Sequence, residues 1–335
     1  MASQCTSKEV MSLMGLIDTY KRWVNFETKN DRCYKSYHPS EFGKCLRAQQ
    51  YKHYVHLGLI KVTYKAFDSK TLRLFDKGHW MHERWARYFE DIGILRGRWK
   101  CKNPLCFLFD DKGKLKTGTN NIESLFEKKK TRVYGMDDSL GSFKPDQCVC
   151  GCKDFQYCET PVVSEELNIK GSADVILDCS TLDFEKFNSV RSTFNPEFLP
   201  TDGAKVVGDM KTIGQSAWDF QLNKKGAHKP YLIQLTCYTH ILDCDYGVLM
   251  YENKNNSELK WYKVERNEEW WETIKWQSKT MQKMVSNKQL PPPRPEDKSS
   301  YECRGCEFSS LCHKSGIWKD KDLNKKRKGF YKSLL

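Results

Sequence analysis

Two apolar runs that each contain a single buried-looking carboxylate constrain the fold of this chain more than any other feature. Residues 171–178 contain Asp174, and residues 206–213 contain Asp209. Apolar and β-branched residues surround both carboxylates, which is the pattern of a buried strand. A carboxylate inside such a strand is costly to bury unless it is paired or binds a cation. The pattern therefore predicts an α/β fold in which neighbouring strands carry the two aspartates.

A lysine follows the second carboxylate, because Lys211 stands two residues after Asp209. Alternate residues of a strand face the same way, so these two side chains should project into one cleft, and Asp174 should join them from a neighbouring strand. Oxygen ligands of this kind suit Mg²⁺ or Mn²⁺, which usually share substrate phosphates. The set indicates a metal-assisted hydrolytic site. From Asp-x-Lys alone, a strand-edge pair with surface roles would be the more frequent interpretation.

Two further patterns occur in the order expected for such a site. Gly78 and His82 form a Gly-x-x-x-His pattern within a predicted helix at 71–94. Gln234 and Tyr238 stand four residues apart on a second predicted helix, so they share one helical face. Together with the aspartates and the lysine, these patterns resemble the PD-(D/E)XK nuclease superfamily, and within it the RecB-type branch.

The resemblance implies a restriction-endonuclease-like fold, a mixed central β-sheet flanked by helices, and a role for each matched residue. One or two Mg²⁺ or Mn²⁺ ions would bind in the cleft, polarise a backbone phosphate and lower the pKa of a water. Lys211 would activate or position the nucleophile, and Gln234 and Tyr238 would align the substrate. The implied metal ligands are His82, Asp174, Asp209 and the main-chain carbonyl of Met210.

The activity that the resemblance implies is exonucleolytic cleavage of DNA in recombination, repair or phage DNA processing. A structure-specific endonuclease or a CRISPR spacer-processing nuclease is a second interpretation within the enzymes. A third interpretation is a DNA-binding protein without catalysis, whose metal sites are structural. Intact Asp174, Asp209 and Lys211 argue against the third interpretation, because a degenerate site would be expected to lose at least one of them.

Three other polar residues near these motifs have weaker claims. His79 is expected to be structural, and Glu83 is only a fallback acidic ligand. Glu159 precedes the strand of Asp174 at a position where an extra acidic ligand could lie. We interpret Glu159 as a solvated glutamate, because that is the commoner role of an isolated carboxylate.

A lone early cysteine and a compact late group predict one metal centre. Cys303, Cys306 and Cys312 follow a C-x2-C-x5-C spacing, and three thiolates are one short of a complete site. Cys45, in a Ser-and-Arg context, is the distant fourth ligand by resemblance to iron–sulfur nucleases of the AddB, CRISPR-associated and exonuclease V types. The resemblance implies a [4Fe-4S] cluster on these four cysteines. The alternative is a zinc site that uses His313 as its fourth ligand.

A second cysteine group predicts a zinc ribbon inserted into the nuclease domain. Two knuckles of cysteine around Pro or Gly are separated by a polar stretch. Four of the five thiols would bind Zn²⁺, and one of the last three is surplus. The alternative is a loop of reduced thiols. The five cysteines are Cys101, Cys106, Cys148, Cys150 and Cys152.

Composition constrains the partners and the compartment. A net charge of +13 favours a polyanion such as DNA. The fifteen cysteines, without a secretion signal, fit a reducing cytoplasm, that of the host if the chain is phage-encoded. No apolar run approaches the length of a membrane span. Protein partners in a recombination or replication complex are also implied, whereas no oligomeric state is predicted.

These patterns divide the chain into four parts. Residues 1–97 form a helical part of the nuclease domain, 98–156 the zinc-ribbon-like insert, 157–290 the nuclease core, and 291–335 the iron–sulfur loop with a basic tail. Residues 180–204 are expected to form a flap over the cleft. The aromatic and basic residues of the tail would either bind nucleic acid or only add solubility.

Overall fold

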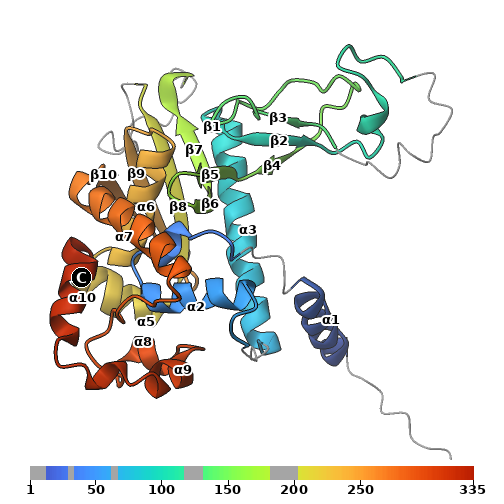
Figure 1. Ribbon diagram of the computed structural model, residues 1–335. Helices are drawn as coiled ribbons and strands as arrows, with labels where there is room; N and C mark the ends of the chain where they lie inside the picture. Colours follow the sequence, from blue (N-terminus) through green and yellow to red (C-terminus); the bar gives the residue numbers. More distant parts are fainter. Residues whose placement is uncertain (1–12, 29–33, 62–66, 117–130, 182–202) are drawn as a thin grey trace, which may run out of the picture.

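A computed structural model of the chain describes residues 13–28, 34–61, 67–116, 131–181 and 203–335 (Figure 1). At its centre lies a five-stranded sheet with the order β1-β7-β8-β9-β10. Neighbours are antiparallel except β8 and β9, which are parallel. The predicted mixed central sheet is therefore confirmed. The strands are β1 (Leu95–Arg96), β7 (Val175–Asp178), β8 (Lys205–Ile213), β9 (Tyr246–Asn253) and β10 (Leu259–Glu265).

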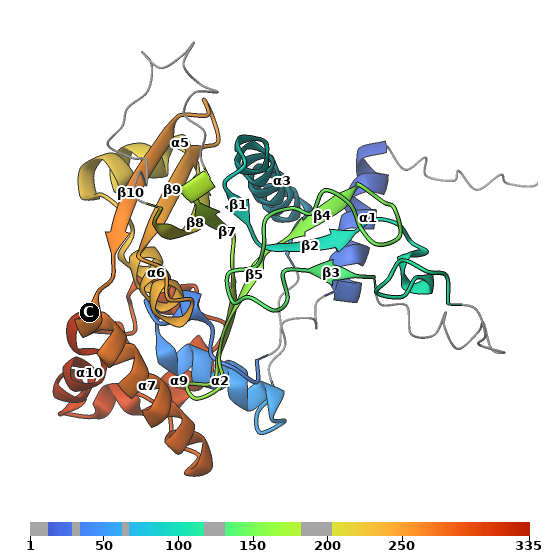
Figure 2. The ribbon, with the colours of Figure 1, turned by 90° about the horizontal axis from the view of Figure 1, so that it is seen from above.

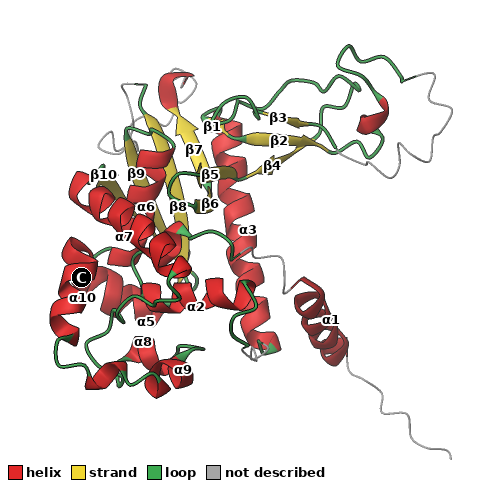
Figure 3. Ribbon diagram, viewed as in Figure 1, coloured by secondary structure: helices red, strands yellow, loops and turns green. Residues whose placement is uncertain are grey.

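Helices cover both faces of this sheet (Figure 3). Alternation along β8 sends Val206 and Met210 towards the cluster that contains Met81 of α3 (Ser69–Ile92). The intervening Val207 packs in the other cluster with Ile233 of α6 (Lys229–Ile241). Asp209 and Lys211 share the parity of Val207, so β8 presents them on the side of α6.

The parallel pair β8 and β9 needs a crossover connection, and helices supply it. The chain leaves β8 through α5 (Gln215–Ala217) and the π-helix η6 (Trp218–Asn223) before it enters α6. Pro230 lies in the first turn of α6, where its missing N–H costs no helical hydrogen bond. On the same side of the sheet, α7 (Glu268–Ser286) begins at Asn267, whose side chain accepts a hydrogen bond from the Trp270 N–H. The crossover therefore sets α6 directly beside the Asp209 strand.

A small sheet forms an arm that extends away from the central sheet (Figures 1 and 2). Its strand order is β3-β2-β4, and a two-stranded hairpin of β5 and β6 follows it in the chain. We use the name arm for residues 98–116 and 131–158. The elements are β2 (Arg98–Cys101), η2 (Cys106–Leu108), β3 (Val133–Tyr134), β4 (Phe155–Cys158), β5 (Thr160–Ser164) and β6 (Ile169–Ala173).

The amino-terminal and carboxyl-terminal parts of the chain contact each other through α2. In the amino-terminal part, α2 lies next to the carboxyl-terminal helices, whereas α1 contacts α3 through an ion pair between Lys21 and Asp76 at 2.6 Å (Figure 1). No helix in the described ranges is both long enough and apolar enough to cross a membrane. The elements are α1 (Leu13–Thr28), η1 (Pro39–Glu41), α2 (Leu46–His56), α8 (Tyr301–Arg304), α9 (Ser309–Lys314), η7 (Ile317–Lys319), α10 (Leu323–Tyr331) and η8 (Lys332–Leu334), with η3 (Cys179–Thr181) after β7.

The carboxyl-terminal tail packs into the core, although we expected its aromatic and basic residues either to bind nucleic acid or only to add solubility. Phe330 and Tyr331 are buried. The Tyr331 hydroxyl accepts a hydrogen bond from the Leu46 N–H at 3.0 Å and donates one to the Pro292 carbonyl at 3.2 Å. Buried rings cannot stack on bases. Most of the predicted flap, residues 182–202, lies outside the described part of the chain.

Candidate functional site

Strand β8 carries the two residues of the Asp-x-Lys pattern, and both take part in one network. The Lys211 Nζ lies 2.7 Å from the Asp209 Oδ2. From α6, the Gln234 Nε2 donates a hydrogen bond to the Asp209 Oδ1 at 2.9 Å. Asp209 is almost fully buried, at 1% exposure. Its negative charge is therefore stabilised by these two partners and not by water.

Asp174 reaches the same place from the break between β6 and β7. Its Oδ2 accepts a hydrogen bond from the Met210 N–H at 2.7 Å. The long interval between Asp174 and Asp209 in sequence is closed by antiparallel pairing, in which Val175 lies opposite Gly208. A side chain at position 208 would start only 2.5 Å from the Val175 Cγ2, so glycine allows this close approach.

His82 joins the two aspartates from α3, a distant part of the sequence. Its Nδ1 lies 3.7 Å from the Asp174 Oδ1, and its Nε2 lies 3.1 Å from the Met210 carbonyl oxygen. His79 and Glu83, one turn away or less, are exposed. The structure thus brings His82, Asp174 and the Met210 peptide together. Asp209 precedes Met210 in β8, but its oxygens bond to Lys211 and Gln234, and it is not among the ligand atoms that lie within 4.8 Å of one another.

Glu159 is exposed, as we expected of a solvated glutamate, and it also lies at this site. One ligand atom from each of His82, Glu159 and Asp174 lies within 4.8 Å of the others. Strands β5 and β6 pair Thr160 with Ala173, and the next step of that register sets Glu159 opposite Asp174. The Ser172 hydroxyl donates a hydrogen bond to Glu159 and orients it. The register of the β5–β6 hairpin is what places Glu159 at this site, and the sequence pattern does not specify that register.

Gln234 and Tyr238 support Asp209 from behind. The Gln234 Nε2 lies 2.7 Å from the Tyr238 hydroxyl as well as bonding to Asp209. Both side chains are buried, at 5% and 4% exposure. In this conformation Gln234 contacts Asp209, and Tyr238 contacts Gln234. Any effect of these two residues on a substrate would therefore come from how they position Asp209.

Burial and charge shift the protonation of every central group. Burial raises the pKa of Asp174 well above its usual range, and the nearby Asp209 raises it further. Burial also raises the pKa of Asp209, against the opposing charge of Lys211. Burial alone would lower the pKa of Lys211, but Asp209 and Asp174 outweigh it and hold this pKa above its usual value. Burial and the charge of Lys211 lower the pKa of His82.

These pKa shifts are compatible with a divalent cation bound beside Asp174, Asp209 and His82. Two crowded carboxylates that resist ionisation need more positive charge than one lysine supplies. An imidazole that stays neutral is the form that binds a metal. The donor set of carboxylate and carbonyl oxygens with one histidine nitrogen suits Mg²⁺ or Mn²⁺.

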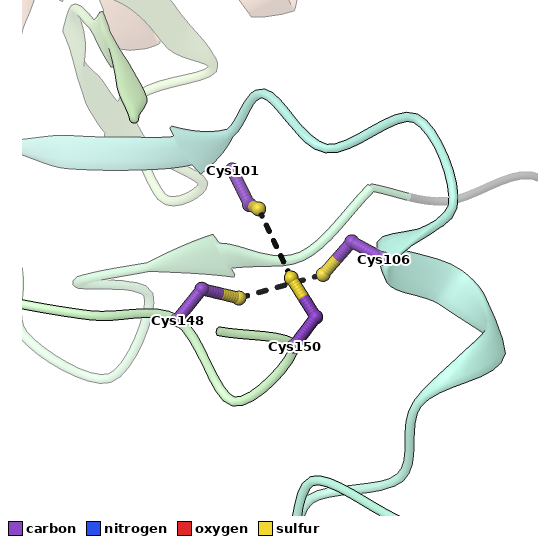
Figure 4. Close-up of side chains that lie close together, drawn as sticks. All are labelled: Cys101, Cys106, Cys148 and Cys150. Carbon is purple, nitrogen blue, oxygen red and sulfur yellow. Dashed lines mark hydrogen bonds between the residues drawn. The ribbon is translucent and has the colours of Figure 1, made fainter. Parts of the chain in front are cut away.

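Four cysteines of the arm form a compact second group (Figure 4). Their sulfur atoms all lie within 4.8 Å of one another, so they could hold one metal ion. The Cys101 and Cys150 sulfurs are 3.7 Å apart, and those of Cys106 and Cys148 are 3.5 Å apart. Cys152 is the surplus cysteine, because its thiol is turned to the Asp154 carbonyl at 3.3 Å.

The Cys148 thiol of this group has a lowered pKa. Burial raises the pKa of Cys148, but the Cys150 N–H and the Tyr134 hydroxyl donate to its sulfur and lower the pKa to about 7. Four cysteines around one point fit a tetrahedral ion such as Zn²⁺.

The other cysteine set lines one cavity of about 950 Å³ between α2 and the carboxyl-terminal helices. The Cys45 N–H donates to Glu302 at 2.7 Å, and the Arg294 N–H donates to the Cys45 sulfur at 3.4 Å, so the distant Cys45 does meet the late segment. Among the described residues, this set is not a tight group like that of the arm. The cavity is lined by Cys45, Cys303, Cys306, Cys312 and His313, among others.

Comparison with known proteins adds little to this geometry. No family model matches the sequence, and no curated protein matches it either. Among solved structures, the chain is similar to the crystal structure of SSO0001, over 89% of this chain and 97% of that one. The sequence identity is 13% and the TM-score is 0.42, so this likeness is too distant to carry an argument.

Proposed function

We propose that this protein is a metal-dependent nuclease of the PD-(D/E)XK type that hydrolyses phosphodiester bonds of DNA, acting as an exonuclease. One observation carries the proposal. Asp174, between β6 and β7, and Asp209, in β8, both adjoin the Met210 peptide. Lys211 lies 2.7 Å from Asp209, and His82 lies 3.1 Å from the Met210 carbonyl. A buried acidic pair with a lysine and a histidine is costly unless it binds a cation.

The contacts of each residue suggest its role in the proposed reaction. A bound Mg²⁺ or Mn²⁺ would polarise a phosphate oxygen and lower the pKa of an attacking water. Asp174, Asp209, His82 and the Met210 carbonyl would hold the ion, and Glu159 is a further candidate ligand. Lys211 lies 5.0 Å from the centre of the Tyr231 ring as well as beside Asp209, and both neighbours favour its charged form.

A charged Lys211 would orient the water or the phosphate by hydrogen bonding. It has no lone pair with which to accept a proton, so we assign it a role in positioning and charge stabilisation. The basic composition of the chain, +13 in net charge, favours DNA as the phosphodiester substrate.

Conservative variants test the proposal. Asp209→Asn keeps the size of the side chain and an oxygen for Gln234, but removes the charge. We expect it to lower Mn²⁺-dependent cleavage of linear DNA at least about 100-fold. Asp137→Asn, at an exposed aspartate of the arm, is the matched control and should cleave like the wild type.

The remaining interpretations give different results in the same assay. A wild-type protein that binds DNA and cuts nothing with Mg²⁺ or Mn²⁺ would leave only the non-catalytic DNA-binding interpretation. Cleavage of end-free circular DNA as fast as linear DNA would make the enzyme an endonuclease.

For the two cysteine sites we propose Zn²⁺ in the arm and a [4Fe-4S] cluster in the cavity at Cys45. Four thiols around one point support the first, and four cysteines spread around a single cavity support the second. Anaerobic metal analysis with visible absorbance tests both. About four irons with sulfide and about one zinc per chain are expected, whereas zinc alone in both sites would refute the cluster.

A further inference from the structure

One face of the arm's sheet is polar and open. Along β2, Trp99 and Cys101 are buried, while Arg98 is partly exposed and Lys100 is exposed. The register pairs Arg98 with Cys158 and Lys100 with Gln156 on β4. Directly opposed residues of antiparallel strands share a face. Arg98, Lys100, Gln156 and Cys158 therefore form one surface, which we call the β2 outer face.

The β2 outer face lies beside the candidate metal site. Only Gly97 separates β2 from β1, which pairs with β7 just after Asp174. On its other side, β2 pairs with β4, which ends one residue before Glu159. The β2 outer face therefore belongs to strands that continue directly into the segments of Asp174 and Glu159.

Neither cation of this face is neutralised by an acidic side chain in the described ranges. The Arg98 Nε is buried and has no hydrogen-bond partner there. Cations nearby are different, because Lys102 pairs with Asp154 at 3.2 Å and Arg96 pairs with Asp138 at 2.7 Å. Among the described residues, both cations of β2 therefore lack an acidic partner, on a strand whose neighbour β4 ends one residue before Glu159.

We propose that Arg98 and Lys100 bind neighbouring phosphates of the nucleic-acid strand that enters the metal site. The inference rests on the proposed nuclease function and gives the arm a role in it. Residues two apart on a strand lie about 6.6 Å from each other, close to the distance between neighbouring phosphates of an extended strand. The Arg98 guanidinium can grip a phosphate with two N–H groups, and Lys100 adds a point charge.

A matched pair of double variants tests this assignment. Arg98→Gln with Lys100→Gln removes both charges and keeps polar side chains on the face. The control, Lys112→Gln with Lys114→Gln, removes two charges from exposed lysines of the same arm, in the turn whose Gly113 packs against Val149. Binding of a fluorescein-labelled DNA oligonucleotide is measured in EDTA, so that no cleavage occurs.

The first variant should raise the Kd about 10-fold and reduce the slope of log K against log salt by about 1.5, as the loss of two phosphate contacts requires. The control should change the Kd less than about twofold. With Mn²⁺, the first variant should show a higher KM and an unchanged kcat. Equal binding by the first variant and the wild type, or an equal loss in both double variants, would overturn the inference.

Failure of the inference can be told apart from failure of the proposed function. If the wild type cleaves DNA and the Arg98 and Lys100 variant binds and cleaves equally well, only the role of this face is wrong. If the wild type binds no Mn²⁺ and cleaves no DNA, the nuclease proposal itself is wrong. Thermal unfolding of both double variants, expected to match the wild type, excludes a loss of fold as the cause.

Discussion

Asp209 shows how several partners hold a single buried carboxylate in place. Its carboxylate has a lysine on one oxygen and a glutamine on the other, and Tyr238 holds the glutamine in turn. Each neighbour offsets part of the cost of burial, yet the pKa of Asp209 stays raised. Because these neighbours do not fully offset the cost of burying its negative charge, a further cation nearby would stabilise the ionised form of Asp209.

The residue that sequence patterns undervalued gives the first prediction. Glu159→Gln should weaken Mn²⁺ binding about 10-fold, because it removes one charged oxygen from a group of three candidate ligands. Glu159 is exposed, so the change should leave the free energy of unfolding almost unaffected. Calorimetric titration with Mn²⁺ measures the effect.

Glu165→Gln is the matched control for this prediction. Glu165 is also exposed and lies on the same hairpin, but its carboxylate pairs with Lys170 at 3.2 Å, away from the site. Equal Mn²⁺ affinity for the Glu159 and Glu165 variants would remove Glu159 from the ligand set.

At the scale of elements, local sequence patterns predicted much of the candidate site, whereas the register between paired strands determined the remaining residues. Two buried carboxylate strands and an i, i+4 pair on a helix are local signals, so Asp174, Asp209 and Gln234 could be found in advance. Glu159 could not, because its place depends on how β5 pairs with β6. The surplus cysteine depends on how the loop around Cys152 turns, which spacing alone does not fix.

The ion pair between β1 and β7 gives a prediction about pH. Burial raises the pKa of Asp178, but hydrogen bonds from Ser180 and the Arg96 guanidinium at 3.1 Å outweigh it and hold the pKa below its usual value. A carboxyl group whose pKa is lower in the folded chain stabilises the fold above its unfolded pKa. This stabilisation is lost as the pH falls through the folded pKa.

Asp178→Asn should therefore lower the free energy of unfolding by about 1–3 kcal/mol near neutral pH. The difference from the wild type should shrink as the pH falls below the usual range of aspartate. Urea denaturation at several pH values measures it. A difference that does not change with pH would show that the charge of Asp178 is not what stabilises this junction.

The cysteine group of the arm allows a test between two neighbouring thiols. Cys150→Ser should abolish tight zinc binding, because Cys150 is one of the four grouped cysteines. Cys152→Ser should retain about one zinc per chain, because its thiol points to a carbonyl outside the group. Metal content after dialysis against a weak chelator separates them. Loss of zinc from both variants would contradict the choice of Cys152 as surplus.

At the scale of the whole molecule, distant segments of sequence are tied together on either side of the central sheet. Cys45 meets the carboxyl-terminal segment at one cavity, and Tyr331 bonds to Leu46 beside it. On the opposite side, α3 brings His82 to Asp174, just before β7, and to the Met210 carbonyl of β8. The arm contributes the two cations of β2, to which we assign phosphate binding. The candidate cation site therefore draws its residues from separate parts of the chain.

We propose that His82 of α3, Asp174 before β7 and Asp209 of β8 share one divalent ion. Pulsed electron paramagnetic resonance of Mn²⁺ bound to the protein tests this arrangement most directly, because a coordinated histidine couples its nitrogen to the metal. We expect tight Mn²⁺ binding with coupling to one histidine nitrogen, and we expect His82→Gln to abolish that coupling while some binding remains. Mn²⁺ that fails to bind, or that binds with the same nitrogen coupling in His82→Gln, would contradict it.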